Sequence, residues 1–321
     1  MSLKILLVKM SSIGDLVHNL PMISDVRAMF PAAQIDWIAE EACVEIPAMH
    51  GGVSNTIPFA LRRWKRERSS SSWREFKAFR QRLRAERYDF VLDNMASLKS
   101  AAVCALARGP SYGPDWRTAR EAPAGLFYDF PIRISRRLHA VERYRFLAAA
   151  ALGYRLDLPL DYGLTGKFAR LAAMPANDYA VFLHSTSRAA KLWPEADWIS
   201  LGKFLAAHGM QCVLPWGNTD ERARSERLAA AIGAAFVPQR MTLNEAMSML
   251  AHARIAVGVD TGLAHMAAAL HRPVVGIFCD SDPLTAGVYT PAPSGNLGAK
   301  GTPPTANEVI SLIEHTILPR I

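Results

Sequence analysis

The sequence predicts an α/β protein with two doubly wound domains, each built on a parallel sheet. Short apolar runs alternate with helical segments through most of the chain, and this alternation is typical of parallel strands joined by crossover helices. The alternation fades between 153 and 177 and starts afresh at 180, so the same architecture occurs twice. A chain of 321 residues, half of them hydrophobic, is long enough to bury two cores.

In the first half, strands are expected where apolar runs precede turns, and helices where apolar residues recur at helical spacing. The expected strands are 4–8, 35–39, 54–57 and 88–92, and the expected helices begin near 16 and cover 73–87, 98–107 and 140–152. The Gly109-Pro110 pair ends the third helix, and an irregular proline-containing stretch precedes the last one.

The second half repeats the pattern with strands and helices in strict alternation. The expected strands are 180–183, 211–214, 235–237, 255–259 and 274–278, and the expected helices are 197–208, 220–232, 243–251, 263–270 and, after a flexible Gly- and Pro-rich connection, 307–317. We therefore expect four parts: a Rossmann-like first domain at 1–160, a linker at 161–178, a Rossmann-like second domain at 179–304 and a terminal helix at 305–321.

Cysteine use and hydropathy indicate a soluble cytosolic protein. The four cysteines are widely scattered without a CxxC pair, which predicts reduced thiols and neither disulfides nor zinc ligands. The apolar run near the N-terminus is too short for a secretion signal, and no stretch of about 18 apolar residues could span a membrane.

The positive charge of the chain is concentrated in one segment. The formal net charge is +8, and segment 61–87 alone carries eleven Lys and Arg against three Glu, with Trp64 and Trp73 between them. This segment is a solvated helix face, a nucleic-acid patch, or a surface for an anionic substrate or membrane, and composition does not choose among them.

Polar residues follow the predicted strands in four loops, at 11–15, 184–191, 216–221 and 260–265. Open parallel sheets bind ligands at the carboxyl ends of their strands. We therefore expect a ligand between the two domains.

The loop at 260–265 joins a buried strand to a helix start. The first turn of such a helix offers the unpaired N–H groups of Thr261, Gly262 and Leu263 to an anion, most simply a phosphate. Asp260 and His265 flank this point, and Gly262 lets a ligand approach the backbone. The alternative is that Asp260 only caps the helix.

Three other loops hold residues with two interpretations each. Asp15 follows small residues at a helix start, and it is either a general base or an N-cap. Lys191, near Thr186 and Ser187, either binds a diphosphate or is a surface lysine. Glu221 either accepts a ribose hydroxyl or joins Asp220 in stabilising a helix start.

Several cofactor motifs are absent from the sequence. It has neither GxGxxG after a strand nor GxxxxGK[ST], which argues against nicotinamide dehydrogenases and P-loop NTPases. Asp280 and Asp282 have the spacing of a divalent-cation site, but this signal is weak, and no metal ligands are assigned.

Six stretches taken together, 9–15, 61–64, 184–188, 191–194, 214–217 and 259–265, resemble the ADP-heptose:lipopolysaccharide heptosyltransferases, most closely the heptosyltransferase I type. The resemblance implies a GT-B fold with an N-terminal acceptor domain, a C-terminal nucleotide-sugar domain and a last helix that returns to the first domain. It also implies inverting transfer of L-glycero-D-manno-heptose from ADP-L-glycero-D-manno-heptose to the first Kdo of Kdo2-lipid A, without an essential metal or cofactor.

The resemblance assigns a role to each candidate residue. Asp15 would be the general base, and Lys191 would assist departure of the diphosphate. Donor-binding residues would be Thr186, Ser187, Lys191, Glu221 (ribose), Met241 (adenine), Asp260 (heptose hydroxyl), Thr261, Gly262, Leu263 and His265. Acceptor-binding residues would be Ser11, Arg62, Arg63 and Arg120.

The same resemblance implies a monomer that meets its acceptor at the cytoplasmic face of the inner membrane and binds no nucleic acid. The serines at 69–72, the basic run at 80–87 and residues 279–282 depart from the family pattern. Two alternatives stay open: a heptosyltransferase with another acceptor, such as heptosyltransferase II, and a non-catalytic nucleic-acid-binding protein that uses segment 61–87.

Overall fold

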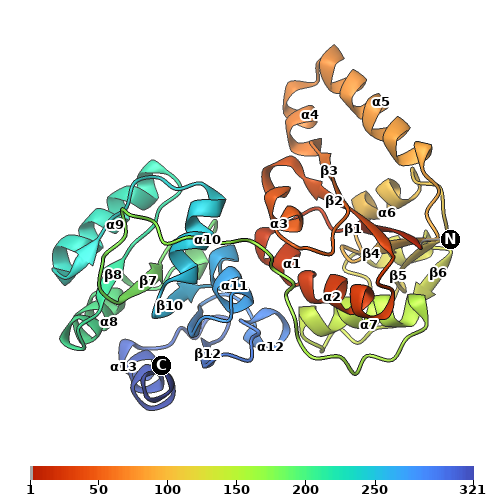
Figure 1. Ribbon diagram of the computed structural model, residues 1–321. Coiled ribbons are helices and arrows are strands. Elements are labelled where there is room, and N and C mark those ends of the chain that lie inside the picture. Colours follow the sequence, from red (N-terminus) through yellow and green to blue (C-terminus); the bar gives the residue numbers. More distant parts are fainter. Residues whose placement is uncertain (1–2) are drawn as a thin grey trace. The chain divides into compact units, whose positions relative to one another are not determined.

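The computed structural model describes residues 3–321 and contains two compact units, the first ending at Gly166 and the second beginning at Lys167. Each unit holds one six-stranded sheet in which all named strands pair in parallel (Figure 1). These sheets confirm the predicted α/β fold with two doubly wound domains.

Both sheets have the same strand order. The first is β3-β2-β1-β4-β5-β6 and the second is β9-β8-β7-β10-β11-β12. The strands are β1 Lys4–Val8, β2 Gln34–Glu40, β3 Asn55–Phe59, β4 Phe90–Asp93, β5 Ser111–Pro114, β6 Phe130–Ile132, β7 Tyr179–Leu183, β8 Gln211–Val213, β9 Ala235–Phe236, β10 Ile255–Val259, β11 Val274–Phe278 and β12 Ser294–Gly298. The order reverses between β1 and β4 and between β7 and β10, and such a switch point is where doubly wound sheets bind ligands.

Helices connect these strands. They are α1 Ile13–Val17, α2 Leu20–Met29, α3 Glu45–Ala48, α4 Leu61–Glu67, α5 Ser70–Ala85, α6 Leu98–Cys104, α7 Ala140–Leu152, α8 Glu195–Ala207, α9 Thr219–Ile232, α10 Leu243–Ala251, α11 Gly262–Ala269, α12 Pro283–Ala286 and α13 Ala306–Leu312. Short turns of other helix types are η1 Glu41–Cys43, η2 Ala122–Leu126, η3 Ala189–Lys191, η4 Ile313–Ile317 and η5 Leu318–Arg320.

The first sheet is covered on both faces. On one face, Leu6 and Val8 of β1 pack with Phe79 and Leu83 of α5 and with Val103 of α6. On the other face, α2 and α7 lie side by side (Figure 1). Because both faces of β1 are buried, its sequence is a continuous apolar run, which is why it could be predicted to the residue.

The second sheet is covered by α8, α9 and α13 on one face and by α10 and α11 on the other. Val309, Ile313 and Ile317 recur every four residues and lie in one core with Leu201 and Leu205 of α8. We expected from the family resemblance that this last helix packs on the first domain. Its buried side chains form one apolar face in the core of the second unit. Its expected packing on the first domain stays a prediction.

Three strands and three short helices, α3, α4 and α12, lie outside the predicted elements. β5 and β6 lie in the stretch predicted to be irregular, and β12 lies in the predicted flexible connection. All three are short and contain proline or glycine, so they lack the apolar run that marks a central strand. The helix α4 was not predicted, because segment 61–67 is dominated by charged residues.

All four cysteines are free thiols, and three of them are buried, as the sequence predicted. Among residues 3–321, no helix is both long and apolar enough to cross a bilayer.

Candidate active site

The first candidate site lies at the switch point of the first sheet. The helices that follow β1 and β4 cover opposite faces, so the loops at the ends of these strands diverge and leave a crevice. A cavity of about 230 Å³ occupies this crevice, and Asp15 and Lys9 form part of its wall.

The Asp15 carboxylate is held from both sides. Ser12 donates its backbone N–H and its hydroxyl to Oδ2, each over 3.2 Å. Lys9 Nζ lies 3.1 Å from Oδ1, and the Tyr144 hydroxyl donates to the same oxygen over 3.0 Å. Lys9 also donates to the Tyr144 hydroxyl over 2.7 Å and to the Asn94 carbonyl over 3.1 Å, so its three protons are all used.

This surrounding fixes the charge of Asp15. Burial raises its pKa, but the charges of Lys9 and His18 and the hydrogen bonds from Lys9 and Ser12 outweigh that effect and bring the pKa well below its usual range. The carboxylate is therefore ionised at neutral pH. Its side chain is 32% exposed, so it remains open to a hydroxyl in the cavity.

The N-cap interpretation of Asp15 was wrong, because Ser12 is the N-cap of α1. Asp15 is the third residue of α1, which begins three residues earlier than expected, and its bond to the Ser12 N–H completes a capping box. One carboxylate oxygen thus fixes the helix start while the other meets Lys9 and Tyr144.

Arginines surround the same cavity. Arg120, a predicted acceptor residue, is exposed and lines it together with Arg136 and Arg143. The buried Nε of Arg143 has no hydrogen-bond partner. The cavity therefore joins one carboxylate to three arginines and Lys9, which suits a polyanionic ligand that carries a reactive hydroxyl. Sequence analysis missed Arg136 and Arg143, although both stand just before or within a predicted helix.

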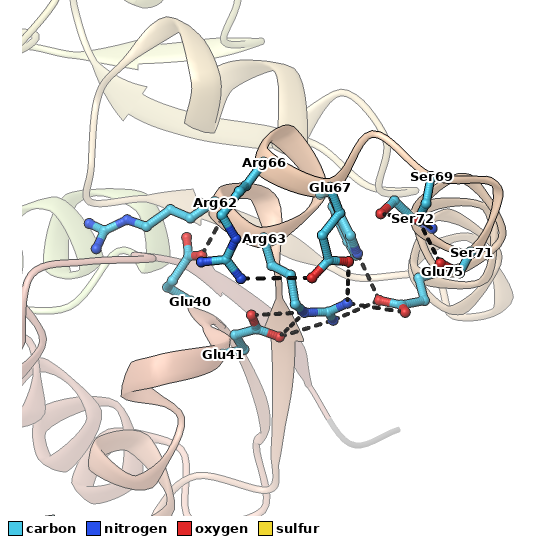
Figure 2. Close-up of polar contacts among 11 residues, drawn as sticks. Glu40, Glu41, Arg62, Arg63, Arg66, Glu67, Ser69, Ser71, Ser72 and Glu75 are labelled. Atoms are coloured by element: carbon cyan, nitrogen blue, oxygen red, sulfur yellow. Dashed lines mark hydrogen bonds and ion pairs between the residues drawn. The ribbon is translucent and has the colours of Figure 1, made fainter.

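Arg63 is in a different environment from the one predicted (Figure 2). Its guanidinium donates to Glu41 over 3.1 Å and to Glu75 over 2.7 and 3.2 Å, and it also lies 3.7 Å from Glu67. The hydrogen bonds that Arg63 donates to Glu75 and then to Glu41 raise the pKa of Arg63 further. This side chain joins η1, α4 and α5 and is already occupied by carboxylates.

The other two predicted acceptor residues stand apart from the cavity wall. Arg62 is exposed, and its backbone N–H donates to Glu40 over 3.3 Å (Figure 2). Ser11 is half-buried in the loop between β1 and α1. Of the four predicted acceptor residues, only Arg120 lines the cavity with Asp15.

The second candidate site lies at the switch point of the second sheet, after β7 and β10. Lys191 bonds Asp260 Oδ2, and Ser281 donates to the same oxygen over 2.6 Å. His265 Nε2 lies 3.8 Å from Oδ1. Burial raises the pKa of Asp260, but the hydrogen bonds from His265, Lys191 and Ser281 outweigh it, so the pKa is lowered and the group is ionised.

These contacts decide two of the open interpretations. Asp260 does not cap α11, because the N-cap residue is Thr261 and the Asp260 carboxylate is held by Lys191 and Ser281. Lys191 is no ordinary surface lysine, since its side chain is 16% exposed and paired. Asp260 thus holds the Lys191 ammonium group close to the start of α11.

The amides predicted to bind an anion stand beside this pair. Thr261, Gly262 and Leu263 are half-buried at the start of α11, and Thr186 donates its hydroxyl to the Asp260 carbonyl over 3.2 Å. Ser187 is exposed in the same loop. The arrangement combines a helix N-terminus, hydroxyls and a lysine, which is a suitable environment for a diphosphate.

The residues predicted to bind the adenosine lie on neighbouring loops. Glu221 accepts the Gly217 N–H over 2.7 Å, and Met241 is half-buried before α10. Asn218 caps α9 by accepting the N–H groups of Asp220 and Glu221 over 3.0 Å each, and both acids stand in the first turn, where their charge stabilises the helix start.

His184 follows β7, and the sequence alone predicts no role for it. Its ring nitrogens contact the Ser225 hydroxyl at 2.8 Å and the Ser185 hydroxyl at 2.9 Å. Burial and then the charge of Arg224 lower its pKa to about 4. His184 is neutral and anchors the loop that carries Thr186 and Lys191.

The acids that suggested a cation site have other partners. Asp282 accepts the Leu284 N–H over 2.9 Å as the cap of α12, and Asp280 lies 4.0 Å from Arg188. In the described part of the chain, no three His, Cys, Asp or Glu side chains form a group suited to a metal ion.

Comparison with known proteins agrees with this geometry. Residues 76–310 match the model of glycosyltransferase family 9 (heptosyltransferase). The chain is 42% identical over 290 residues to lipopolysaccharide heptosyltransferase 1 of Escherichia coli K12, covering 89% of this chain and 91% of that protein. It is 27% identical over 310 residues to lipopolysaccharide heptosyltransferase 2 of the same strain, covering 88% and 84%.

Two solved structures match almost the whole chain. E. coli heptosyltransferase WaaC with ADP has a TM-score of 0.89 and 39% identity, and WaaC with ADP-2-deoxy-2-fluoro heptose has 0.86 and 40%. Each comparison covers 97% of this chain and 99% of the other. The fold and its two switch-point sites thus define a GT-B glycosyltransferase. The chain belongs to glycosyltransferase family 9, the heptosyltransferases.

Proposed function

We propose that this protein transfers L-glycero-D-manno-heptose from ADP-heptose to the first Kdo of Kdo2-lipid A, with inversion at the anomeric carbon. The observation that carries the proposal is the ionised Asp15 carboxylate on the wall of a cavity lined with three arginines. The higher identity to heptosyltransferase 1 than to heptosyltransferase 2 supports the first Kdo as the acceptor sugar.

The second unit binds the donor in this proposal. The diphosphate takes the amides of Thr261, Gly262 and Leu263 and the charge of Lys191, which leaves Asp260 to accept a heptose hydroxyl. Glu221 and Met241 hold the adenosine. The solved structures of WaaC with ADP and with ADP-2-deoxy-2-fluoro heptose support this choice of donor.

The first unit binds the acceptor and activates it. Arg120, Arg136 and Arg143 neutralise its carboxylates and phosphates, and the Kdo hydroxyl lies against Asp15. As the hydroxyl oxygen bonds to the anomeric carbon, the bond from that carbon to the diphosphate breaks and ADP leaves with the electron pair. The hydroxyl proton passes to Asp15. This carboxylate is a weak base, so the proton moves only as bond formation makes the hydroxyl more acidic.

The setting of the reaction is also a proposal. The acceptor is a lipid, so we place the protein at the cytoplasmic face of the inner membrane as a peripheral monomer. The Lys191 cation and the backbone N–H groups at the start of α11 stabilise the leaving diphosphate. We therefore propose that no metal is required.

The test is ADP release from ADP-heptose, with and without de-acylated Kdo2-lipid A, in EDTA. We expect acceptor-dependent release despite chelation, and its loss in Asp15→Asn with ADP affinity nearly unchanged. Release only with an acceptor that already carries one heptose would assign the second transfer instead. Release that requires added divalent cations would refute the metal-independent step, and no release with either acceptor would refute the proposal.

A further inference from the structure

The helices α4 and α5 form a hairpin that extends from the sheet of the first unit (Figure 1). Two side chains of α4 fasten the hairpin. Arg63 donates to Glu75 of α5 (Figure 2), and Trp64 donates to the same carboxylate over 2.8 Å. The left-handed backbone of Arg68 ends α4, and Ser69 caps α5. The hairpin is therefore a built element and not a solvated loop.

A cationic stripe runs along α5. Trp73, Lys77, Arg80 and Arg84 are spaced by four, three and four residues, so they share one face over about 16 Å, and all four are exposed. Like charges on successive turns repel one another in a helix. An uncompensated stripe of this kind indicates a negatively charged partner.

The acidic residues of the segment are already committed elsewhere. Glu67 and Glu75 bind Arg63, and Glu86 binds Lys4. Within the described chain, Lys77, Arg80 and Arg84 have no ion pair. The charge of the stripe is thus available to another molecule.

An apolar groove lies beside the stripe. A cavity of about 400 Å³ opens between the two helices. Its apolar lining is Leu61, Trp64, Trp73 and Phe76, with Lys65 and Arg68 also on its wall. Trp73 is 71% exposed, and its ring meets Phe76 edge-on at 6.3 Å. A tryptophan and a groove of this kind beside cations match the boundary between lipid headgroups and acyl chains.

We propose that the α4–α5 hairpin docks this protein on an anionic phospholipid bilayer, with Trp73 and the groove at the acyl boundary and the Lys77-Arg80-Arg84 stripe on the headgroups. Docking deepens the proposed function, since it brings the enzyme to the surface that holds its lipid acceptor. It requires neither donor nor acceptor. The apolar groove distinguishes this partner from a polynucleotide, which the stripe alone could also bind.

The test measures sedimentation of the full chain with phosphatidylcholine vesicles that contain or lack about 30% phosphatidylglycerol. We expect binding only to the anionic vesicles, and weaker binding as salt rises. Replacing Lys77, Arg80 and Arg84 by Gln should weaken binding roughly 100-fold, at about fivefold for each cation. Trp73→Ala should weaken it roughly tenfold.

Two matched controls test whether vesicle binding depends on the hairpin surface. Replacing the exposed Lys167, Lys203 and Lys300 by Gln changes the net charge equally outside the hairpin, and Phe127→Ala removes another aromatic ring that is 66% exposed. Both should bind vesicles nearly as the wild type does. Equal losses in the hairpin variants and these controls, or a loss with Phe127→Ala but not with Trp73→Ala, would overturn the assignment.

Two further measurements separate this inference from its rivals. The hairpin variants should keep wild-type transfer to the soluble de-acylated acceptor, which also shows that they fold. Vesicle binding in a protein that transfers no heptose would refute only the proposed function. Tight binding to tRNA or duplex DNA at physiological salt, lost in the stripe variant while no vesicle binding is seen, would replace the bilayer with a nucleic acid.

Discussion

The charge of Lys9 predicts how the first site responds to mutation. Its side chain is 3% exposed, and Lys9→Met removes the cation 3.1 Å from Asp15 together with hydrogen bonds to Tyr144 and Asn94. At an effective dielectric constant of about 20, this separation corresponds to an attraction of about 5 kcal/mol before desolvation is subtracted. Removing one partner of a fully buried pair costs about 3–5 kcal/mol. Because Asp15 is 32% exposed, water solvates the remaining carboxylate in part, and we expect a loss of about 2–3 kcal/mol.

The loss should depend on pH with a definite sign. Asp15 has a lowered pKa in the folded protein, so its contribution to stability is complete above the ordinary carboxyl range and disappears as pH falls through the folded pKa. The difference in unfolding free energy between wild type and Lys9→Met should therefore be largest near neutral pH and shrink in acid. In the variant, burial without the cation raises the pKa of Asp15, so the acid limb of kcat/KM should move to higher pH.

The assay is denaturant unfolding at several pH values with the pH profile of transfer. Lys4→Met is the matched control, since Lys4 begins β1, the strand that Lys9 directly follows, and pairs with Glu86 through side chains that are 36% and 49% exposed. An exposed pair of this kind contributes under about 1 kcal/mol. The reasoning is refuted if Lys9→Met loses no more stability than Lys4→Met, or if its acid limb does not move.

Three further predictions follow from other contacts. Asp260→Asn frees Lys191 from its carboxylate, so calorimetry should find ADP affinity kept or raised while the KM of ADP-heptose rises; weaker ADP binding would contradict this role. Arg145→Met leaves the buried Asp25 carboxylate without its two-point partner at 2.7 and 2.9 Å, which should cost about 3–5 kcal/mol in urea unfolding, and a loss under 1 kcal/mol would show that the pair is dispensable. His184, with a pKa lowered from 6.5 to about 4, should make the protein less stable as pH falls from 6.5 to 4, by about 3 kcal/mol, and His184→Gln should flatten that dependence; an unchanged slope would refute it.

The central strands were predictable because they are buried on both faces. β1, β7, β10 and β11 are continuous apolar runs, and their bounds match the sequence prediction within a residue. The loops after these strands could then be ranked by residue type, which pointed to Asp15, Lys191 and Asp260 without any structure. The strands β5, β6 and β12, which lie at a sheet edge or next to one, become strands only through pairing with a neighbour, so their sequences carried no comparable signal.

The amino-acid sequence by itself determined the α/β class, the two domains, the strand ends that carry polar residues and the resemblance to the heptosyltransferases. The tertiary structure decided which of these side chains meet. Packing of α7 on the first sheet brings Tyr144 to Asp15 across 129 residues of sequence, and packing of α4 against η1 and α5 surrounds Arg63 with three carboxylates. The local sequence pattern indicates which residues are buried and where turns occur. A contact between distant segments depends on the distance between their atoms. That distance is set only when the sheets and their covering helices have packed.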